Sequence, residues 1–491
     1  MPSAVQLRTI TTDIPARLDR LPWARFHWMV VLGLGTVWIL DGLEVTIVGS
    51  MSEALKPADT GLGMSNFDIG LAGAVYVAGG CLGALVFGQL TDRFGRKKLF
   101  LITLALYTVA TVLTAFSPNP LWYFACRFLT GAGIGGEYAA INSAIDELIP
   151  AHYRGRVDIV INGSFWVGAV GGALLTIPLL DPTKVNPSIG WRLAFGLGAV
   201  LALGVLLVRR KVPESPRWLF IHGREDDGER IVTEIEEQVR AEDGELPEPS
   251  GTITVRQRRS IGMALIARSV FTLYPRRTVL CFALFIGQAF LYNAFFFTYG
   301  DTLTTFLGVK QTGWYIAIFA ASNFLGALLL SPLFDTVGRV RMIAGTYIVS
   351  GILLAITGVI LGSLTAVTLT LCGAIIFFFA SAGASSAYLT VSEIFPLETR
   401  ALCIAFFYAI GTAAGGIAGP LLFGSLIENA SGSGDITKIA LGYFIGAALM
   451  IAGGVVEAIF GVKAERQALE HIATPLTVED TSEADSDAGR T

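Results

Sequence analysis

Charged side chains are scarce in this sequence. Asp, Glu, Lys and Arg make up 15% of the 491 residues, whereas about 25% is usual in a soluble domain. Hydrophobic residues reach 53%, and the mean hydropathy is +0.62. Soluble helices need polar faces, and the long apolar segments of this chain have none. The composition therefore excludes a large soluble protein, and the formal net charge of −4 gives no indication of nucleic-acid binding.

Residues that build catalytic or metal sites are also few. The five cysteines lie singly inside apolar segments, at spacings that match neither a disulfide framework nor a metal site. The four histidines fall at or beyond the ends of those segments and form no cluster. No nucleophile motif and no phosphate-binding Gly-Lys motif is present. These absences argue against an enzyme and against ATP-driven pumping, and we expect neither a cofactor nor a metal.

What the sequence has instead is a series of long apolar stretches. A membrane-spanning helix needs about 20 predominantly apolar residues. Twelve such stretches can be marked, at 28–50, 67–91, 99–117, 121–148, 157–180, 191–208, 278–300, 313–334, 342–362, 365–392, 401–426 and 438–460. The 56 glycines suit this interpretation, because small residues let helices approach closely where lipid supplies no hydrophobic drive between them.

Two short motifs occur once in each half, at the ends of apolar stretches. Asp92-Arg93-x-Gly95-Arg96 returns as Asp335-x-x-Gly338-Arg339, and Glu147-x-x-Pro150-x-x-x-Arg154 returns as Glu393-x-x-Pro396-x-x-x-Arg400. Parallel repeats of apolar spans are typical of transporters that bind their substrate between the repeats, near the bilayer midplane. The expected fold is therefore an all-α membrane protein, with twelve transmembrane helices in two pseudo-symmetric six-helix bundles.

Basic residues in the short loops predict the orientation. Nine fall in the connectors on one side of the membrane and four in those on the other. We therefore expect a multi-pass protein of the cell membrane with both termini in the cytoplasm. The expected divisions are a cytoplasmic N-terminal segment (1–26), a first bundle (27–208), a cytoplasmic linker (209–277), a second bundle (278–462) and an acidic, disordered cytoplasmic tail (463–491).

Four motifs, in the expected order, resemble the major facilitator superfamily over residues 25–465. They are Gly88-x-x-x-Asp92-Arg93-x-Gly95-Arg96, Arg127-x-x-x-Gly131-x-Gly133-x-Gly135, Pro213-Glu214-Ser215-Pro216-Arg217 and Ser392-Glu393-x-x-Pro396. The last three are similar to the sugar porters and their relatives. The resemblance implies transport by alternating access, with the first and fourth spans as neighbours.

The positions at which sugar porters contact their substrate depart from that branch. The resemblance implies a Gln on the fifth span, two Gln and an Asn on the seventh, and a Trp on the tenth. This chain has Asn162, then Gln288 without a second Gln but with Asn293, and Tyr388. The run from Gly135 to Tyr138 is more similar to metabolite:proton symporters that carry small organic acids. The substrate class therefore stays open between a sugar or polyol and an organic acid.

Ionisable residues inside spans cost at least about 2.5–3.5 kcal/mol each at a helix centre, so they normally face a cavity. Asp41 and Glu44 share one face of the first span, and Arg127 and Glu137 lie in the fourth. The resemblance implies that Glu44 pairs with Arg127 and carries a proton, with Asp41 as the competing candidate. A static ion pair is the alternative. Glu137 is either a second proton or substrate site or a neutral, hydrogen-bonded carboxyl.

The repeated charges at the cytoplasmic helix ends are expected to form a gate that holds the two halves together when the cavity faces outward. These gate residues are Asp92, Arg93, Gly95, Arg96, Glu147, Arg154, Asp335, Arg339, Glu393 and Arg400. A signal for membrane orientation would explain the basic residues alone, but it would not explain why acid, proline and arginine recur at matched spacing.

Amides and aromatic rings on three spans are the expected substrate ligands. They are Asn162, Trp166, Gln288, Tyr292, Asn293 and Tyr388. An amide without a partner in hydrocarbon is costly, which favours a cavity for the three amides. A lipid-facing position is the alternative for Trp166 and Tyr292.

The leading functional hypothesis is proton-coupled symport of a small polar organic solute. A facilitative uniporter, an exporter of the same fold and a membrane sensor that does not transport are the alternatives, and a sensor would be free to lose the repeated loop motifs. The expected partners are the solute, the proton and the lipid bilayer, without nucleic acid, and the protein is expected to be a monomer.

Overall fold

Twelve long helical spans make up most of the computed structural model. It describes residues 9–473 apart from 65, 210–212, 250, 257–268, 310–311, 397–399, 432–433, 466 and 468–471. The first-half spans are α2 (Arg25–Ser50), α4 (Asn66–Phe94), α5 (Arg96–Ala115), α6 (Pro120–Leu148), the pair α7 (Ala151–Gly163) and α8 (Phe165–Leu179), and α9 (Pro187–Arg209). The second-half spans are α13 (Pro275–Leu307), α14 (Gly313–Thr336), α15 (Arg339–Ile360), α16 (Ala366–Ile394), α17 (Arg400–Ser431) and α18 (Ala440–Phe460).

Eleven segments of the described chain are long and apolar enough to cross a membrane. The remaining span is α6, a 29-residue helix that carries Arg127 and Glu137 and packs against α4 and α5. The prediction of an all-helical, twelve-span membrane protein is thus confirmed. The expected tail, 463–491, lies largely outside the described residues.

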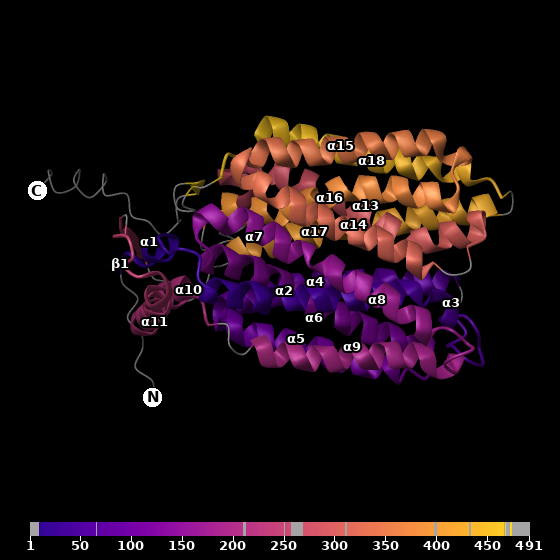
Figure 1. Ribbon diagram of the computed structural model, residues 1–491, viewed down its shortest axis with the longest axis horizontal. Coiled ribbons are helices and arrows are strands. Elements are labelled where there is room, and N and C mark those ends of the chain that lie inside the picture. Colours follow the sequence, from indigo (N-terminus) through magenta and orange to yellow (C-terminus); the bar gives the residue numbers. More distant parts are fainter. Residues whose placement is uncertain are drawn as a thin grey trace, which may run out of the picture.

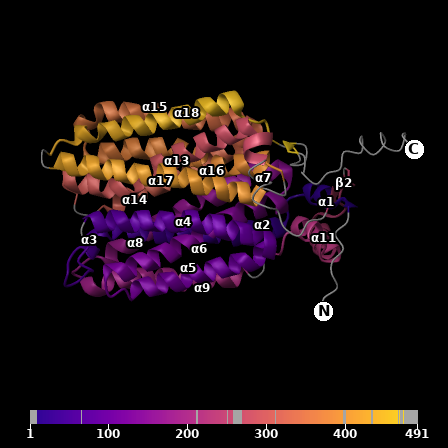
Figure 2. The same cartoon turned by 180° about the vertical axis from the view of Figure 1, so that it is seen from behind.

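The two halves form two bundles that lie side by side, the first drawn in indigo to magenta and the second in orange to yellow (Figures 1 and 2). They meet chiefly where α4 packs against α17 and where α7 and α8 pack against α14. Any space between the halves is therefore walled by helices from both repeats. This is the arrangement in which a substrate site between repeats is expected.

Glycines bring backbones into contact within each bundle. A Cβ at Gly42 on α2 would overlap the carbonyl of Phe165 on α8, and a Cβ at Gly168 would overlap the carbonyl of Ile39. Van der Waals packing between close backbones stabilises helix pairs in lipid. The high glycine content of the sequence is thus used where α2 crosses α8.

The fifth span, predicted at 157–180, is one stretch from Ala151 to Leu179 with a local irregularity at Ser164. Helix α7 ends at Gly163 and α8 begins at Phe165. Between them, the Ser164 hydroxyl donates to the carbonyl of Ile161 at 2.6 Å and lies 3.1 Å from that of Gly35 on α2. A hydroxyl that bonds a nearby carbonyl competes with the helical ladder and bends it. This irregular residue lies directly before Phe165 and Trp166 and two residues after Asn162.

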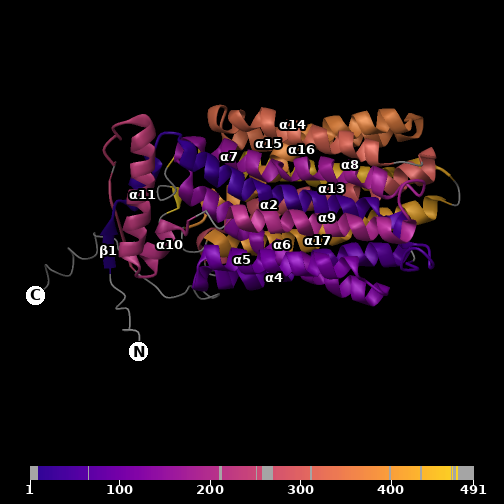
Figure 3. The same ribbon diagram turned by 60° about the horizontal axis from the view of Figure 1, so that its bottom comes forward.

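A small subdomain lies beyond one end of the bundles (Figure 3). It contains β1 (Thr9–Thr12), α1 (Ile14–Asp19), α10 (Pro216–Ile221), α11 (Glu225–Asp243) and β2 (Ile253–Arg256), and we call it the linker subdomain. Strand β1 pairs with β2 in antiparallel register, with Thr9 opposite Arg256. The N-terminal segment is therefore joined to the linker between the halves.

Ion pairs hold the N-terminal segment on the linker subdomain. Arg17 Nη2 and Arg20 Nη2 each donate to the carboxylate of Glu236 on α11, at 2.8 and 2.5 Å. At the end of α1, Asp19 accepts from Arg154 Nη2 of α7 at 3.2 Å. Burial tends to raise the pKa of Glu236, but the hydrogen bonds from the two arginines outweigh it and lower that pKa.

Replacing Glu236 with Gln is expected to loosen the N-terminal segment. Removing a buried hydrogen-bonded charge from opposite two arginines should lower the local free energy of unfolding by about 1–3 kcal/mol. Because the folded-state pKa of Glu236 is lowered, its stabilisation is present above the ordinary glutamate pKa and is lost as the pH falls through the folded value. Hydrogen exchange of residues 9–20 measures the change.

The control for this prediction is Glu237→Gln, because Glu237 is an exposed neighbour on the same helix. Its hydrogen exchange should match that of the wild type. Equal exchange in both variants would show that the charge on Glu236 does not hold the segment.

Candidate substrate and proton site

A buried ion pair joins α2 and α6 in the first half. Arg127 Nη1 donates to Glu44 Oε1, and the two residues are only 2% and 1% exposed. The guanidinium also lies over the ring of Tyr76 on α4, 4.5 Å from its centroid. A desolvated cation over an aromatic face gains electrostatic attraction beyond that of its ion pair. The structure thus brings Glu44 and Arg127 together, and their role in proton coupling stays a prediction.

Two further carboxyl groups lie near this pair. Asp41, one turn before Glu44 on α2, and Glu137 on α6 are each 1% exposed and lie within electrostatic reach of one another. The cluster thus holds three carboxyl groups and one guanidinium. An unbalanced charge in a low-dielectric interior has a high electrostatic free energy. Gain or loss of a proton by this cluster would therefore change its electrostatic free energy strongly.

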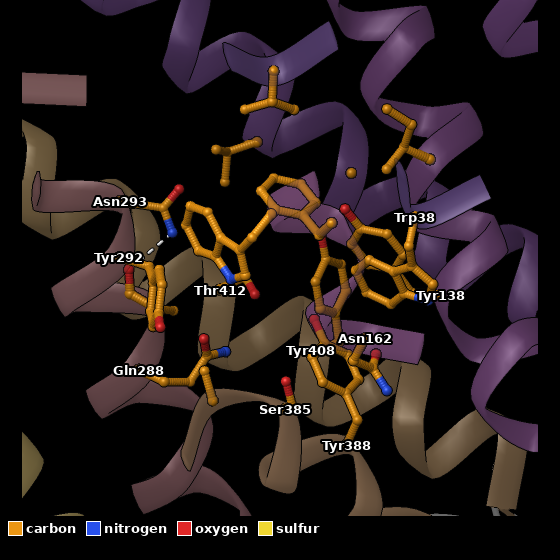
Figure 4. Close-up of a pocket in the computed structure, with 18 of the residues that line it drawn as sticks. Trp38, Tyr138, Asn162, Gln288, Tyr292, Asn293, Ser385, Tyr388, Tyr408 and Thr412 are labelled. Carbon is orange, nitrogen blue, oxygen red and sulfur yellow. Dashed lines mark hydrogen bonds between the residues drawn. The ribbon is translucent and has the colours of Figure 1, made fainter. Parts of the chain in front are cut away.

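A cavity of about 180 Å³ lies between the two halves (Figure 4). Its walls come from α2, α4, α6, α7 and α8 of the first half and from α13, α16 and α17 of the second. All six expected substrate ligands line it: Asn162, Trp166, Gln288, Tyr292, Asn293 and Tyr388. That they bind substrate remains a prediction, but the structure brings residues from three distant spans to one place.

Four aromatic rings, two from each half, meet at one side of this cavity, and we call them the aromatic quartet. Trp38 on α2 stacks on Tyr138 on α6 with ring centroids 4.4 Å apart and planes 6° apart. Tyr408 on α17 meets Tyr138 edge-on at 5.1 Å, and Tyr388 on α16 meets Trp38 at 6.0 Å. The quartet therefore links the halves by ring contacts.

The sequence analysis identified Tyr388 but missed Trp38, Tyr138 and Tyr408. One signal was available: Trp38 lies three residues before Asp41, which places it on the same helical face as the two acids. Tyr76, which separates Arg127 from the cavity, was also missed. An aromatic residue in an apolar span carries no pattern that distinguishes a cavity wall from a lipid-facing position.

The polar groups of the cavity differ in how far their hydrogen bonds are satisfied. Asn162 and Asn293 each donate an amide hydrogen to a carbonyl of their own helix, both at 2.8 Å. The Tyr292 hydroxyl donates to Asn323 at 2.9 Å. Within the described part of the chain, Gln288 makes no hydrogen bond, although it is only 8% exposed. Gln288 is thus a free donor and acceptor in the cavity wall.

In the second half, three of the expected gate residues form one buried network. Arg339 donates through Nε and Nη2 to the two oxygens of Glu393, both at 2.9 Å, and through Nη1 to Asp335 at 2.8 Å. The other oxygen of Asp335 accepts from the backbone N–H of Arg156 in the first half at 2.9 Å. This hydrogen bond crosses between the halves at the end of the bundles near the linker subdomain.

In the first half, one gate residue bonds to α1 of the linker subdomain, and another bonds to the residue that caps α10. The Ser215 hydroxyl donates to Glu147, and Arg154 donates to Asp19. Arg400 is buried at the start of α17. The side chains of Asp92, Arg93 and Arg96 lie outside the described part of the structure, so their predicted contacts stay predictions.

The backbone of the repeated loop motif is alike in both halves. Gly95 and Gly338 have φ angles of +94° and +109° and directly precede α5 and α15. Only glycine adopts this backbone region without strain, which is the physical reason for a glycine at this point of each motif.

Metal binding was not expected from the sequence. Among the described residues, no group of three or more His, Cys, Asp or Glu side chains is placed to hold a metal ion.

Comparisons with known proteins agree on the family. The family described as "Sugar (and other) transporter" matches residues 40–475. The chain is similar to the niacin transporter NiaP of Acinetobacter baylyi, with 29% identity over 94% of this chain and 99% of the relative. It is also similar to the 4-hydroxybenzoate transporter PcaK of the same organism, with 27% identity over 81% and 85% of the two chains.

Among solved structures, the fold matches the proton:xylose symporter XylE bound to 6-bromo-6-deoxy-D-glucose. The TM-score is 0.74 at 17% identity, over 91% of this chain and 98% of that one. At this identity, the likeness shows the fold.

Proposed function

The chain belongs to the sugar (and other) transporter family of the major facilitator superfamily, and on that premise we propose that it is a proton-coupled symporter of a small polar organic solute. Proteins of this family and fold are transporters and not enzymes. The observation that carries the proposal is the cavity between the halves, with the Glu44–Arg127 pair directly behind its Tyr76 wall. Because Tyr76 contacts both the cavity and Arg127, binding of the solute can affect the protonation of Glu44, and protonation can affect solute binding.

We assign the proton to Glu44. Protonation of Glu44 cancels its attraction to Arg127, which frees the guanidinium and removes a contact between α2 and α6. A conformational equilibrium shifts only by the difference in binding free energy between its two states. The Glu44–Arg127 ion pair provides this difference in binding free energy for the proton, because the pair forms only when Glu44 is ionised and is lost when Glu44 is protonated. Asp41 is the competing carrier, and Glu137 is a second proton site.

The gate residues act at a distance from the substrate in this proposal. The Asp335–Arg156 hydrogen bond favours the conformation in which the halves touch at this end. Opening the cavity to that side requires this contact to break. Substitutions in the gate are therefore expected to change turnover more than substrate binding.

Uptake into proteoliposomes tests the proposal. An inward proton gradient should drive accumulation of the transported solute, and a protonophore should abolish it. Equal uptake with and without the gradient would indicate a uniporter, and binding without any flux would indicate a sensor. The named relatives carry niacin and 4-hydroxybenzoate, so small aromatic acids belong in the screen beside sugars and polyols.

We further propose that the protein resides in the cell membrane, with both termini, the linker (209–277) and the tail (463–491) in the cytoplasm. The support is the asymmetry of nine short-loop basic residues against four. A reporter that is active only in the cytoplasm, fused after Thr491, is expected to be active. An inserted but silent fusion would reject this orientation, and the same reporter placed in the loop between α5 and α6 is the control that should be silent.

A further inference from the structure

The cavity walls are unusually rich in aromatic rings. Eight of its lining residues are Trp, Tyr or Phe. In Figure 4, Trp38 and Tyr138 stand on one side of the cavity, and Tyr292 stands on the other. Trp166 lies 5.5 Å from Tyr292, with the ring planes inclined by 36°. Flat faces of this kind bind another flat ring by offset or edge-to-face contact.

Several polar groups of the cavity wall remain available close to the rings, among them the hydroxyls of Tyr388 and Tyr408. Gln288, Ser385 and Thr412 are 8%, 7% and 8% exposed, and all three line the cavity. No hydrogen bond ties any of them to another residue in the described ranges. A buried polar group without a partner is destabilising, so a ligand that supplies the partner is favoured. The side chains of Gln288, Ser385 and Thr412 are enough to satisfy the polar atoms of one amide.

None of the described residues that line the cavity is charged. Arg127 is separated from it by the ring of Tyr76 and is already paired with Glu44. Asp41 and Glu137 are each 1% exposed and are not among the lining residues. An anion would therefore enter a low-dielectric site without a cation and near an excess of carboxyl groups, and an organic cation would find no exposed carboxylate.

The volume sets the size of the ligand. The cavity measures about 180 Å³, and apolar cavities of about 150 Å³ bind benzene. One six-membered ring with a short substituent therefore fills it.

We propose that the transported solute is an uncharged, planar, single-ring aromatic compound with a carboxamide-like substituent. The ring lies among the aromatic walls, and the Gln288 amide pairs with the substituent by one donated and one accepted hydrogen bond. Ser385 and Thr412 bond the remaining polar atoms. This inference rests on the proposed transport function and specifies the substrate class of the same cavity.

Three ligands of one shape separate the alternatives. Nicotinamide is neutral, nicotinate is its anionic counterpart, and 1-methylnicotinamide is its cationic counterpart. Binding to the purified full-length protein at neutral pH is measured by calorimetry, with D-xylose as the sugar probe. We expect nicotinamide to bind at least tenfold more tightly than the other three. Tighter or equal binding of nicotinate, 1-methylnicotinamide or xylose would overturn the assignment.

A variant tests the role of Gln288. Gln288→Leu should weaken nicotinamide binding about 10–100-fold, a loss of up to two bonds, but should change the binding of pyridine, which lacks the carboxamide, by less than threefold. Gln89→Leu, on the exposed face of α4 and away from the cavity, is the matched control. Equal weakening of nicotinamide and pyridine would contradict the pairing.

Ser385→Ala provides a second variant in case Gln288→Leu does not fold, and it should weaken nicotinamide binding about three- to tenfold. Counterflow in proteoliposomes separates this inference from the proposed function. Flux of a sugar or a carboxylate in place of nicotinamide would leave the function standing and overturn the substrate class. Folded protein that binds nicotinamide without moving it would support the site and overturn transport.

Discussion

The Glu44→Gln variant is expected to exchange solute across the membrane but to lose accumulation driven by a pH gradient. Gln has nearly the shape of a protonated Glu and cannot release a proton. A gradient of one pH unit provides about 1.4 kcal/mol per proton, which allows about tenfold accumulation in the wild type. In the variant, the ratio of inside to outside solute should stay near one. Proteoliposome uptake under an imposed gradient measures the ratio, and counterflow measures exchange.

The physical reason for this expectation is the burial of the pair. Glu44 and Arg127 are almost inaccessible to solvent, so neither charge is compensated by water when the other is removed. In the Glu44→Gln variant, the neutral amide leaves the Arg127 guanidinium without its ion-pair partner, as protonation of Glu44 would do. The variant should therefore move between its two orientations with substrate bound, which permits exchange, but it should not complete the steps in which the proton is released.

Asp41→Asn is the matched control, because Asp41 lies one turn away on the same helix and is equally buried. We expect it to retain gradient-driven accumulation. If Asp41→Asn loses accumulation and Glu44→Gln retains it, Asp41 is the proton carrier. If neither variant changes accumulation, proton coupling through this cluster is wrong.

The second large effect is expected at Arg339. Replacing it with Leu leaves the carboxylates of Asp335 and Glu393 buried without their shared cation. Breaking a buried, hydrogen-bonded charge network by removing one partner typically costs about 3–5 kcal/mol. We expect a clear fall in the melting temperature of the purified protein and at least a tenfold loss of transport.

Two variants separate this network from a general effect of losing positive charge. Arg341→Leu removes an exposed arginine two residues further along α15, so its melting temperature should stay close to that of the wild type. Arg339→Lys keeps the charge but cannot donate in parallel to both oxygens of Glu393, so it should recover only part of the stability. Equal melting temperatures for Arg339→Leu and Arg341→Leu would contradict the importance of the network.

Stability and transport need not fall together at the gate. Asp335 accepts from Arg339 and from the backbone of Arg156, so it belongs both to the network within the second half and to the contact between halves. A variant that keeps its melting temperature but changes turnover would isolate the second role.

The fold was predictable because its signals are local. Apolar runs of about twenty residues, repeated loop motifs and the basic residues at their ends each act where they stand in the chain. The pairing of Glu44 with Arg127 followed from the family resemblance, since residue spacing gives no measure of the distance between two spans.

Other features of the molecule escaped prediction because they depend on partners that are distant in sequence. The pairing of β1 with β2 joins short strands more than two hundred residues apart, and neither strand is stable alone. The contact of the Ser164 hydroxyl with the Gly35 carbonyl depends on how α2 lies beside the fifth span.

The sequence by itself determined that this protein is a membrane transporter of two similar halves, and it named the acids, the arginine and the amides that such a protein could use. Tertiary structure alone decided that Trp38, Tyr138, Tyr388 and Tyr408 meet in one quartet and that Tyr76 stands between Arg127 and the cavity. It also decided that Gln288 has no hydrogen-bond partner among the described residues. The reason is geometric. Hydropathy fixes where a helix crosses the bilayer, whereas the rotation and contact of neighbouring helices decide which of its faces lines the cavity.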